Sequence, residues 1–309
     1  MNDYRKQRLI WYKGEIIPIE NATINIMSTT AQYGINVFEG VRCYYNVEEK
    51  KLFGFRLLEH LKRLLDSAKL LRFNLPKEIN QEYIKRNFVN IIRANGYREN
   101  IYVKICMFLD NEIGWYSSEP ISTFINPFPK DKPAFEKPGV DCCVSSWERI
   151  NESAIPPRIK TGANYINGRL ALMEANLNGY DYSIILNRNY KVAEGPGACI
   201  FIVRNNKLIT PPITASILES ITRLSILELA TSELNINIEE REIDRTELYI
   251  ADEIFLVGTQ VEIVPVLSVD HIPINNRNVG KLTTILINSY SKLVRGDLDR
   301  FKKWLIEIY

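Results

Sequence analysis

Four prolines between residues 126 and 138 constrain the fold of this chain more than any other feature. They are Pro127, Pro129, Pro133 and Pro138. Prolines spaced among charged residues are typical of a linker between domains. A chain of 309 residues is also long for a single hydrophobic core. We therefore predict a smaller N-terminal domain at 1–125, a linker at 126–138 and a larger C-terminal domain at 139–309.

Hydrophobic periodicity predicts helices and strands in both domains, and so an α+β fold. In the first domain, apolar residues at helical spacing predict helices at 56–72 and 78–95, and alternation predicts a strand at 101–109. Helices are also predicted at 163–178, 219–235 and 280–294. Further short strands are predicted at 8–20, 22–27, 140–147, 182–187, 190–193, 199–203, 207–210 and 253–257.

The composition excludes several classes of protein. The net charge of +2 and the lack of a basic run alternating with aromatics argue against a nucleic-acid partner. No stretch is apolar for long enough to span a bilayer or to act as a signal peptide, which favours a cytoplasmic protein without a membrane partner. The five cysteines are odd in number and form no C-x-x-C pair, as expected for reduced thiols.

Histidine and glycine motifs are also scarce. His60 and His271 lie far apart in the sequence, so we predict no metal site built on histidines. The chain has no G-x-S-x-G elbow, no G-x-x-x-x-G-K loop and no G-x-G-x-x-G after a strand. With histidine metal sites, the hydrolase elbow and nucleotide-binding loops excluded, lysine is the main candidate for a catalytic residue.

Lys160 is the lysine best placed for chemistry. It follows the rigid segment 155–158 and precedes a turn of small residues, directly before a predicted helix that carries Tyr165. An amine held in this way can form a Schiff base with a carbonyl group or an aldehyde cofactor. The alternative is a solvated surface lysine, so Lys160 needs support from other residues.

Other residues suit an enzyme site but also have plain structural explanations. Arg63 flanks the apolar stripe of its predicted helix, where it reaches either a cleft or solvent. Tyr102 and Lys104 share one face of a predicted strand, where they bind a carboxylate or form a solvated face. Two glycines bracket an aromatic segment around Phe38, which is either a binding loop or a hairpin.

Three turns in the C-terminal domain complete the candidates. Glu194 stands at a predicted strand end, where the Gly195-Pro196-Gly197 turn fixes its position. The start of the predicted helix at 219–235 offers free amides to an anion, although capping alone explains its Ser and Thr residues. The Gly258-Thr259-Gln260 turn between two strands can present amides to a phosphate or a carboxylate.

Taken together, these segments resemble the class IV pyridoxal-phosphate aminotransferases, and within them the branched-chain amino-acid aminotransferases. The resemblance extends from about Trp11 to Tyr290 with the motifs in the same order. It implies a two-domain fold of type IV, like that of D-amino-acid aminotransferase, with a barrel-like sheet and flanking helices in the larger domain. The motifs are 33–44, 55–60, Arg63-Leu64, 160–165, 194–197, 220–223, Gly258-Thr259 and Glu262-Ile263.

The resemblance also implies roles for these residues and pyridoxal 5′-phosphate as the cofactor. Lys160 would hold the cofactor as a Schiff base and move the proton, Glu194 would keep the pyridine nitrogen protonated, and Tyr165 would donate to the ring oxygen. The implied phosphate ligands are Arg63, Ile221, Thr222 and Thr259. The implied substrate contacts are Tyr33, Phe38, Tyr102, Lys104, Gly258, Thr259 and Gln260, with Tyr33 coming from a neighbouring subunit of a homodimer or larger homo-oligomer.

The expected reaction transfers the amino group of leucine, isoleucine or valine to 2-oxoglutarate in a ping-pong sequence. Some positions depart from the family pattern, notably Lys104 in place of arginine and Gln260 in place of a small residue. A D-amino-acid or R-amine transaminase and an aminodeoxychorismate lyase therefore remain alternatives. A homologue without cofactor or activity is a third alternative, which the presence of Lys160 and Glu194 disfavours.

Overall fold

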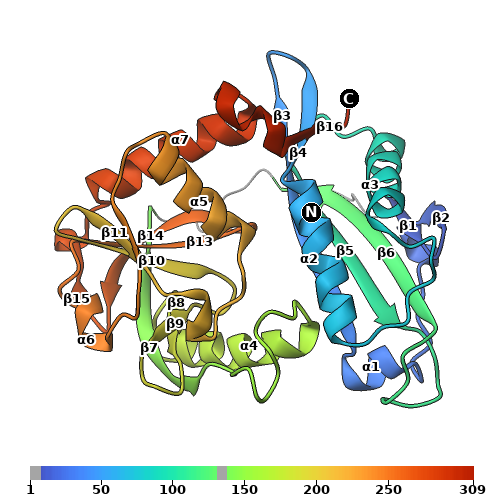
Figure 1. The fold of residues 1–309 in the computed structure, drawn as a ribbon, viewed down its shortest axis with the longest axis horizontal. Coiled ribbons are helices and arrows are strands. Elements are labelled where there is room, and N and C mark those ends of the chain that lie inside the picture. Colours follow the sequence, from blue (N-terminus) through green and yellow to red (C-terminus); the bar gives the residue numbers. More distant parts are fainter. Residues whose placement is uncertain (1–7, 131–137) are drawn as a thin grey trace. The chain divides into compact units, whose positions relative to one another are not determined.

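The computed structural model describes residues 8–130 and 138–309, which divide into two compact units (Figure 1). The described residues of the first unit fall within Met1–Lys132, Ile159–Ala163 and Val294–Tyr309, and those of the second within Pro133–Arg158 and Asn164–Leu293. The units therefore differ from the predicted domains, because two segments beyond residue 139 belong to the first unit. Strand pairing and burial explain this: residues 305–307 add a strand to the first sheet, and Ile159 is buried in the first core.

The first unit is built on an antiparallel sheet of seven strands in the order β16-β4-β3-β5-β6-β1-β2. The strands are β1 (Leu9–Tyr12), β2 (Glu15–Pro18), β3 (Asn36–Asn46), β4 (Lys51–Phe55), β5 (Ile101–Leu109), β6 (Ile121–Pro129) and β16 (Leu305–Glu307). The helices are α1 (Thr29–Tyr33), α2 (Leu57–Leu70) and α3 (Gln81–Asn95), with short 3₁₀ helices at Ile19–Asn21 and Asp299–Trp304.

Periodic sequence explains why these elements form. In β5 the alternate residues Ile101, Val103 and Ile105 are fully buried, as the alternation predicts, and α2 and α3 pack their apolar stripes into the same core. Helix α3 begins after Asn80, whose side chain accepts a hydrogen bond from the Tyr83 amide, and it ends at Gly96 with φ of 67°. The predicted helices at 56–72 and 78–95 and the strand at 101–109 are confirmed, with ends that differ by a few residues.

The segment predicted as a linker begins inside a strand, so that prediction was wrong for residues 126–129. Pro127 lies opposite Val103 in β5, while among the residues that the structure describes, β1 pairs with β6 at Phe124 and Ile125 alone. This end of β6 is therefore an edge, where a proline that lacks an N–H breaks no ladder. Residues 131–137 of the predicted linker lie outside the described residues.

The strand predicted at 22–27 does not form. The Met27 amide donates to the Asn25 side chain at 2.9 Å, a local turn that competes with strand pairing.

The second unit is built on a mixed sheet of nine strands in the order β12-β11-β10-β13-β14-β7-β8-β9, with β15 paired to β14. The strands are β7 (Val140–Glu148), β8 (Tyr182–Leu186), β9 (Val192–Glu194), β10 (Cys199–Arg204), β11 (Lys207–Thr210), β12 (Ile238–Glu240), β13 (Glu253–Gly258), β14 (Glu262–Val269) and β15 (Ile272–Pro273). The helices are α4 (Gly162–Leu177), α5 (Ile221–Ser232), α6 (Arg245–Leu248) and α7 (Lys281–Arg295), with short 3₁₀ helices at Ile213–Ala215 and Asn275–Arg277. The predicted α+β class is confirmed.

Helix α4 buries small side chains and exposes several of its large apolar ones. Its buried positions include Gly168 and Ala171, whereas Ile166 is 61% and Leu177 85% exposed. A Cβ atom on Gly168 would lie 2.4 Å from the Pro196 carbonyl oxygen, so only glycine allows this close approach. The glycine face of α4 thereby supports the 194–197 turn.

Candidate active site

Lys160 is fixed in the first unit by its own backbone. The Lys160 carbonyl accepts a hydrogen bond from the Phe38 amide at 2.9 Å, and the Lys160 amide donates to the Ser67 hydroxyl at 3.1 Å. Thr161 forms a bridge with Val37 of β3. A lysine anchored to both β3 and α2 is held far more firmly than a surface lysine on a loop.

Phe38 lies close to two ammonium groups. The Nζ atom of Lys160 lies 5.0 Å from the centre of its ring, and that of Lys104 lies 4.9 Å from the same centre. Both distances lie within the range of cation–π attraction. The structure therefore brings together three of the residues that the sequence singled out.

Tyr102 lies against the backbone of β3. A Cβ atom on Gly40 would lie only 1.6 Å from the Tyr102 hydroxyl oxygen, so the tyrosine occupies the space that glycine leaves. The Tyr102 ring also packs on Phe128, with ring centres 5.4 Å apart. Gly40 is thus required to place the Tyr102 hydroxyl, a relation that the sequence did not reveal.

Arg63 forms a buried cluster with two residues that the sequence analysis did not select. Its Nε and Nη2 atoms contact the two carboxylate oxygens of Glu39 at 2.6 and 2.9 Å. The Nδ1 atom of His60 lies 2.7 Å from Oε2 of the same carboxylate. Burial opposes ionisation of Glu39, but the charge of Arg63 and the hydrogen bonds from Arg63 and His60 hold its pKa well below the usual range. Burial lowers the pKa of His60, so the imidazole is neutral at pH 7.

In the second unit, Glu194 is buried and ion-paired. The Nη2 and Nε atoms of Arg149 lie 2.8 and 3.0 Å from its Oε1 atom, and the Leu218 amide donates to the same oxygen at 3.2 Å. The Cys199 thiol lies 3.6 Å from Oε2. Arg149 is itself oriented by the Asn167 side chain at 3.1 Å. These contacts hold a carboxylate at a fixed position in a dry environment, where it interacts strongly with any positive charge.

Two tyrosines lie beside the glycine turn that follows Glu194. The Tyr182 hydroxyl accepts a hydrogen bond from the Gly197 amide at 3.1 Å, and burial raises the pKa of this phenol. A Cβ atom on Gly197 would lie 3.8 Å from the Tyr165 ring. Tyr165, the predicted ring-oxygen donor, is therefore close to the turn that carries Glu194.

The start of α5 meets the turn at Gly258. Ser220 caps the helix by accepting from the Arg223 amide, while the amides of Ile221 and Thr222 belong to the first turn, where a helix offers them no carbonyl partner. The Thr222 and Thr259 hydroxyl oxygens lie 3.5 Å apart. This combination of helix amides and hydroxyls is suited to binding a phosphate or another anion.

The predicted residues thus form two sets, one on each unit. The first unit carries Phe38, Arg63, Tyr102, Lys104 and Lys160, and the second carries Tyr165, Glu194, Ile221, Thr222, Gly258, Thr259 and Gln260. Tyr33 ends α1 in the first unit and is 54% exposed, without a contact to these residues that the described structure records. Gln260 is also exposed.

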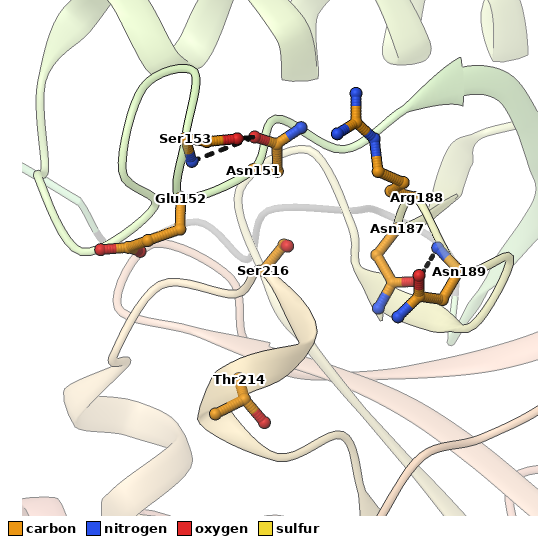
Figure 2. A pocket seen from close by; sticks show the side chains of 8 residues that line it. All are labelled: Asn151, Glu152, Ser153, Asn187, Arg188, Asn189, Thr214 and Ser216. Atoms are coloured by element: carbon orange, nitrogen blue, oxygen red, sulfur yellow. Dashed lines mark hydrogen bonds between the residues drawn. The ribbon is translucent and has the colours of Figure 1, made fainter.

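The polar residues that line a cavity of about 380 Å³ in the second unit belong to neither set (Figure 2). They are Asn151, Glu152, Ser153, Asn187, Arg188, Asn189, Thr214 and Ser216. The Asn151 side chain accepts hydrogen bonds from Ser153, and the Asn187 side chain accepts one from the Asn189 amide (Figure 2). These polar groups stabilise their own turns, so we do not assign a ligand to the cavity.

Sequence reasoning missed Glu39, His60 and Arg149. For His60 a signal existed, because His60 and Arg63 are three residues apart and so lie on one face of α2. For Arg149 no local signal existed. Its amide donates to the Leu186 carbonyl at 2.8 Å, so the pairing of β7 with β8 brings it to Glu194.

Among the described residues, no group of three or more His, Cys, Asp or Glu side chains is placed to hold a metal ion. Within the same part of the chain, each helix is too short or too polar to cross a bilayer.

Comparison with known proteins identifies the family of this chain. Residues 36–269 match the family described as amino-transferase class IV. A probable branched-chain-amino-acid aminotransferase of Aquifex aeolicus is 39% identical over 304 residues, which cover 97% of this chain and 96% of that protein.

Two solved structures are similar over nearly the whole chain. The branched-chain amino acid aminotransferase of Thermobaculum terrenum in its PLP form has a TM-score of 0.93 and 39% identity, and covers 99% of both chains. The branched-chain aminotransferase of the archaeon Thermoproteus uzoniensis with norvaline has a TM-score of 0.91 and 35% identity, and covers 98% of this chain and 99% of that one. These similarities confirm the expected type IV fold. The chain therefore belongs to the class IV aminotransferases.

Proposed function

We propose that this protein is a branched-chain amino-acid aminotransferase that uses pyridoxal 5′-phosphate. It transfers the amino group of leucine, isoleucine or valine to 2-oxoglutarate in a ping-pong reaction. The observation that carries this proposal is Lys160, whose backbone is anchored to β3 and α2, in a chain that resembles branched-chain aminotransferases over nearly its full length. One of these relatives is solved in its PLP form and another with the amino acid norvaline.

The residues present fit the three parts of the cofactor. Lys160 offers an amine to an aldehyde, Glu194 offers a buried carboxylate to a ring nitrogen, and the amides of α5 offer donors to a phosphate. When bound, pyridoxal 5′-phosphate supplies the aldehyde that takes up an amino group and a ring that withdraws electrons from the α-carbon.

Each of these residues would have a separate role toward the cofactor. Lys160 would hold the cofactor through its amine, and when that amine is free its Nζ atom would accept a proton from the substrate α-carbon and return it elsewhere in the reaction. Glu194, kept in place by Arg149, would keep a proton on the ring nitrogen. Tyr165 would donate a hydrogen bond to the ring oxygen. The proposed phosphate ligands are Arg63, Ile221, Thr222 and Thr259.

The proposed substrate contacts follow the charge and shape of a branched-chain amino acid. Tyr102 and the amides of the 258–260 turn would bind the α-carboxylate, and Lys104 the distal carboxylate of the second substrate. Phe38 would form an apolar wall for the side chain, together with Tyr33 of the partner subunit. Gln260 belongs to the 258–260 turn, and its side chain would lie beside the substrate and limit the size of the substrate.

A homodimer or larger homo-oligomer is part of the proposal. Two loops of the first unit expose large apolar side chains, among them Ile26 at 80%, Trp115 at 66% and Tyr116 at 77%. The Thr29 amide donates to the Asn111 carbonyl at 2.7 Å, which joins the two loops. A joined apolar surface of this kind is typical of a subunit interface. We also infer a cytoplasmic protein, since its five cysteines are unpaired thiols, as in a reducing compartment.

The test is an assay of purified protein with L-leucine, 2-oxoglutarate and pyridoxal 5′-phosphate, with Lys160→Ala beside the wild type. We expect glutamate from the wild type and a loss of at least about a thousandfold in the variant, because the amine serves both to hold the cofactor and to move the proton. Borohydride should fix the cofactor to the wild type but not to Lys160→Ala, as read by mass spectrometry. Absence of glutamate with every branched-chain donor would refute the proposal.

A class IV enzyme of different specificity is the second candidate, and Lys104 and Gln260 favour it. A lysine binds a carboxylate as a point charge, whereas arginine binds it with two parallel hydrogen bonds. A panel of L-amino acids, D-amino acids and R-amines, with chiral analysis of the products, separates the candidates. Strong preference for L-leucine and L-isoleucine would exclude the second one.

A further inference from the structure

The buried cluster of Glu39, His60 and Arg63 is more elaborate than a structural ion pair requires. Glu39 lies on the core face of β3, between the fully buried Val37 and Val41, and its own side chain is fully buried. His60 is 1% exposed, whereas the Arg63 side chain keeps 12% exposure. The cluster thus has a carboxylate at its closed end and a guanidinium at its open end.

The contacts fix the plane of the Arg63 guanidinium. Glu39 accepts one N–H from Nε and one from Nη2, which is the two-pronged geometry of arginine with a carboxylate. The neutral His60 ring donates from Nδ1 to Oε2, so the carboxylate cannot rotate away from the guanidinium. A guanidinium has five N–H groups, and this arrangement directs the Nη1 edge away from Glu39.

Lys160 acts on the same cluster. Its positive charge is one of the influences that keep His60 neutral, and its amide donates to Ser67 on the same helix as His60. The carboxylate of Glu39 therefore compensates the positive charge of Arg63 close to the reactive amine. Without that carboxylate, the Arg63 guanidinium would lose its two-pronged contact, and the compensation of its charge by Glu39 would be lost.

We propose that Glu39 is a positioning residue, which with His60 aims the Arg63 guanidinium at the 5′-phosphate of the cofactor. The inference rests on the proposed function, in which Arg63 is a phosphate ligand. The proposed positioning role differs from a purely structural role because it predicts a change in affinity only for ligands that carry a phosphate. A residue that merely stabilises the first unit would affect the binding of pyridoxal and pyridoxal 5′-phosphate alike.

The test compares the wild type with Glu39→Gln, which keeps the shape of the side chain but removes its charge. Loss of cofactor from the holoenzyme on dilution is followed by absorbance, and rebinding is titrated with pyridoxal 5′-phosphate and with pyridoxal. We expect the affinity for pyridoxal 5′-phosphate to fall about 10- to 100-fold, the effect of one well-placed charge-assisted hydrogen bond. Affinity for pyridoxal should change less than about twofold, because pyridoxal lacks the group that Arg63 contacts.

Glu253→Gln is the matched control. Glu253 accepts hydrogen bonds from the amides of Leu282 and Thr283 at the start of α7 and is not part of the proposed site. We expect it to retain both ligands as the wild type does. Equal losses of the two ligands in Glu39→Gln, or wild-type retention of pyridoxal 5′-phosphate, would overturn the positioning role.

Arg63→Lys keeps the inference testable if Glu39→Gln does not fold. The lysine retains the charge but cannot form the two-pronged contact with Glu39. It should therefore lose pyridoxal 5′-phosphate about tenfold more readily than the wild type while binding pyridoxal normally. If Arg63→Lys retained the cofactor as firmly as the wild type, the orientation of the side chain at position 63 would not determine phosphate binding. Failure of the wild type itself to bind pyridoxal 5′-phosphate would instead refute the proposed function.

Discussion

Lys104 is the residue at which this chain differs most clearly from the pattern of its family. It lies on β5 with its Nζ atom 4.9 Å from the Phe38 ring, and its side chain is exposed. We expect Lys104→Arg to lower the KM for 2-oxoglutarate about fivefold, because a guanidinium binds a carboxylate with two hydrogen bonds and an ammonium does not. The KM for L-leucine should stay unchanged, since leucine has no distal carboxylate.

The control for this substitution is Lys51→Arg, on the surface of the first unit. Lys51 pairs with Glu307 at 2.8 Å, and arginine there should leave both KM values as they are. A rise in the KM for 2-oxoglutarate in Lys104→Arg would mean that Lys104 does not face this substrate. Steady-state kinetics with each substrate varied in turn measures the effect.

Helix α4 illustrates how one element determines the position of another. Its small-residue face lies against the turn that carries Glu194, with no room for a Cβ atom on Gly168. Alanine favours a helix over glycine by about 1 kcal/mol, but backbone overlap with Pro196 costs about 1–3 kcal/mol or more. We therefore expect Gly168→Ala to lower the free energy of unfolding, as measured by urea denaturation.

Asn176→Ala is the control on the same helix. Asn176 is exposed, so the substitution adds helix propensity without any new contact and should be neutral or slightly stabilising. A Gly168→Ala variant that matched this control would show that α4 can shift away from the turn at little cost. Reduced cofactor affinity in Gly168→Ala alone would show that the 194–197 turn moves with the helix.

The whole molecule should lose stability in acid through the cluster of the first unit. His60 is buried and neutral with a lowered pKa, so the unfolded chain binds its proton first, below about pH 6.5. Glu39 also has a lowered pKa, and its contribution is lost as the pH falls below about 4.3. We expect the thermal midpoint to be constant between about pH 7 and 8 and to fall from about pH 6.5 downward.

The two histidines allow a matched comparison. His60→Gln should flatten the part of the profile between about pH 6.5 and 5, because the group that takes up the proton is gone. His271 is exposed and stacks on Tyr180, and His271→Gln should leave the profile as it is. If the thermal midpoint of His60→Gln fell with pH as steeply as that of the wild type, groups other than His60 would be responsible for the loss of stability in acid.

Local periodicity was enough to predict much of the fold. The two helices of the first unit, the strand β5 and most elements of the second unit were predicted to within a few residues, because a packed face repeats at 2.0 or 3.6 residues along the chain. The prediction was wrong where proline was read as a linker signal. A proline fits at position 127 because, among the described residues, that end of β6 pairs with β5 on one side alone. Which strand ends lie at an edge depends on the pairing of strands, which local periodicity does not reveal.

The sequence by itself determined the family, through motifs that lie in order along the chain, and it singled out Lys160, Glu194 and Arg63 as site residues. Only the tertiary structure decided which groups support them. Glu39 and Arg63 are 24 residues apart, and Arg149 and Glu194 are 45 apart. The reason is physical: side-chain type and spacing are local properties, whereas a buried charge acquires its partner from the pairing of strands and the packing of helices that bring distant residues together.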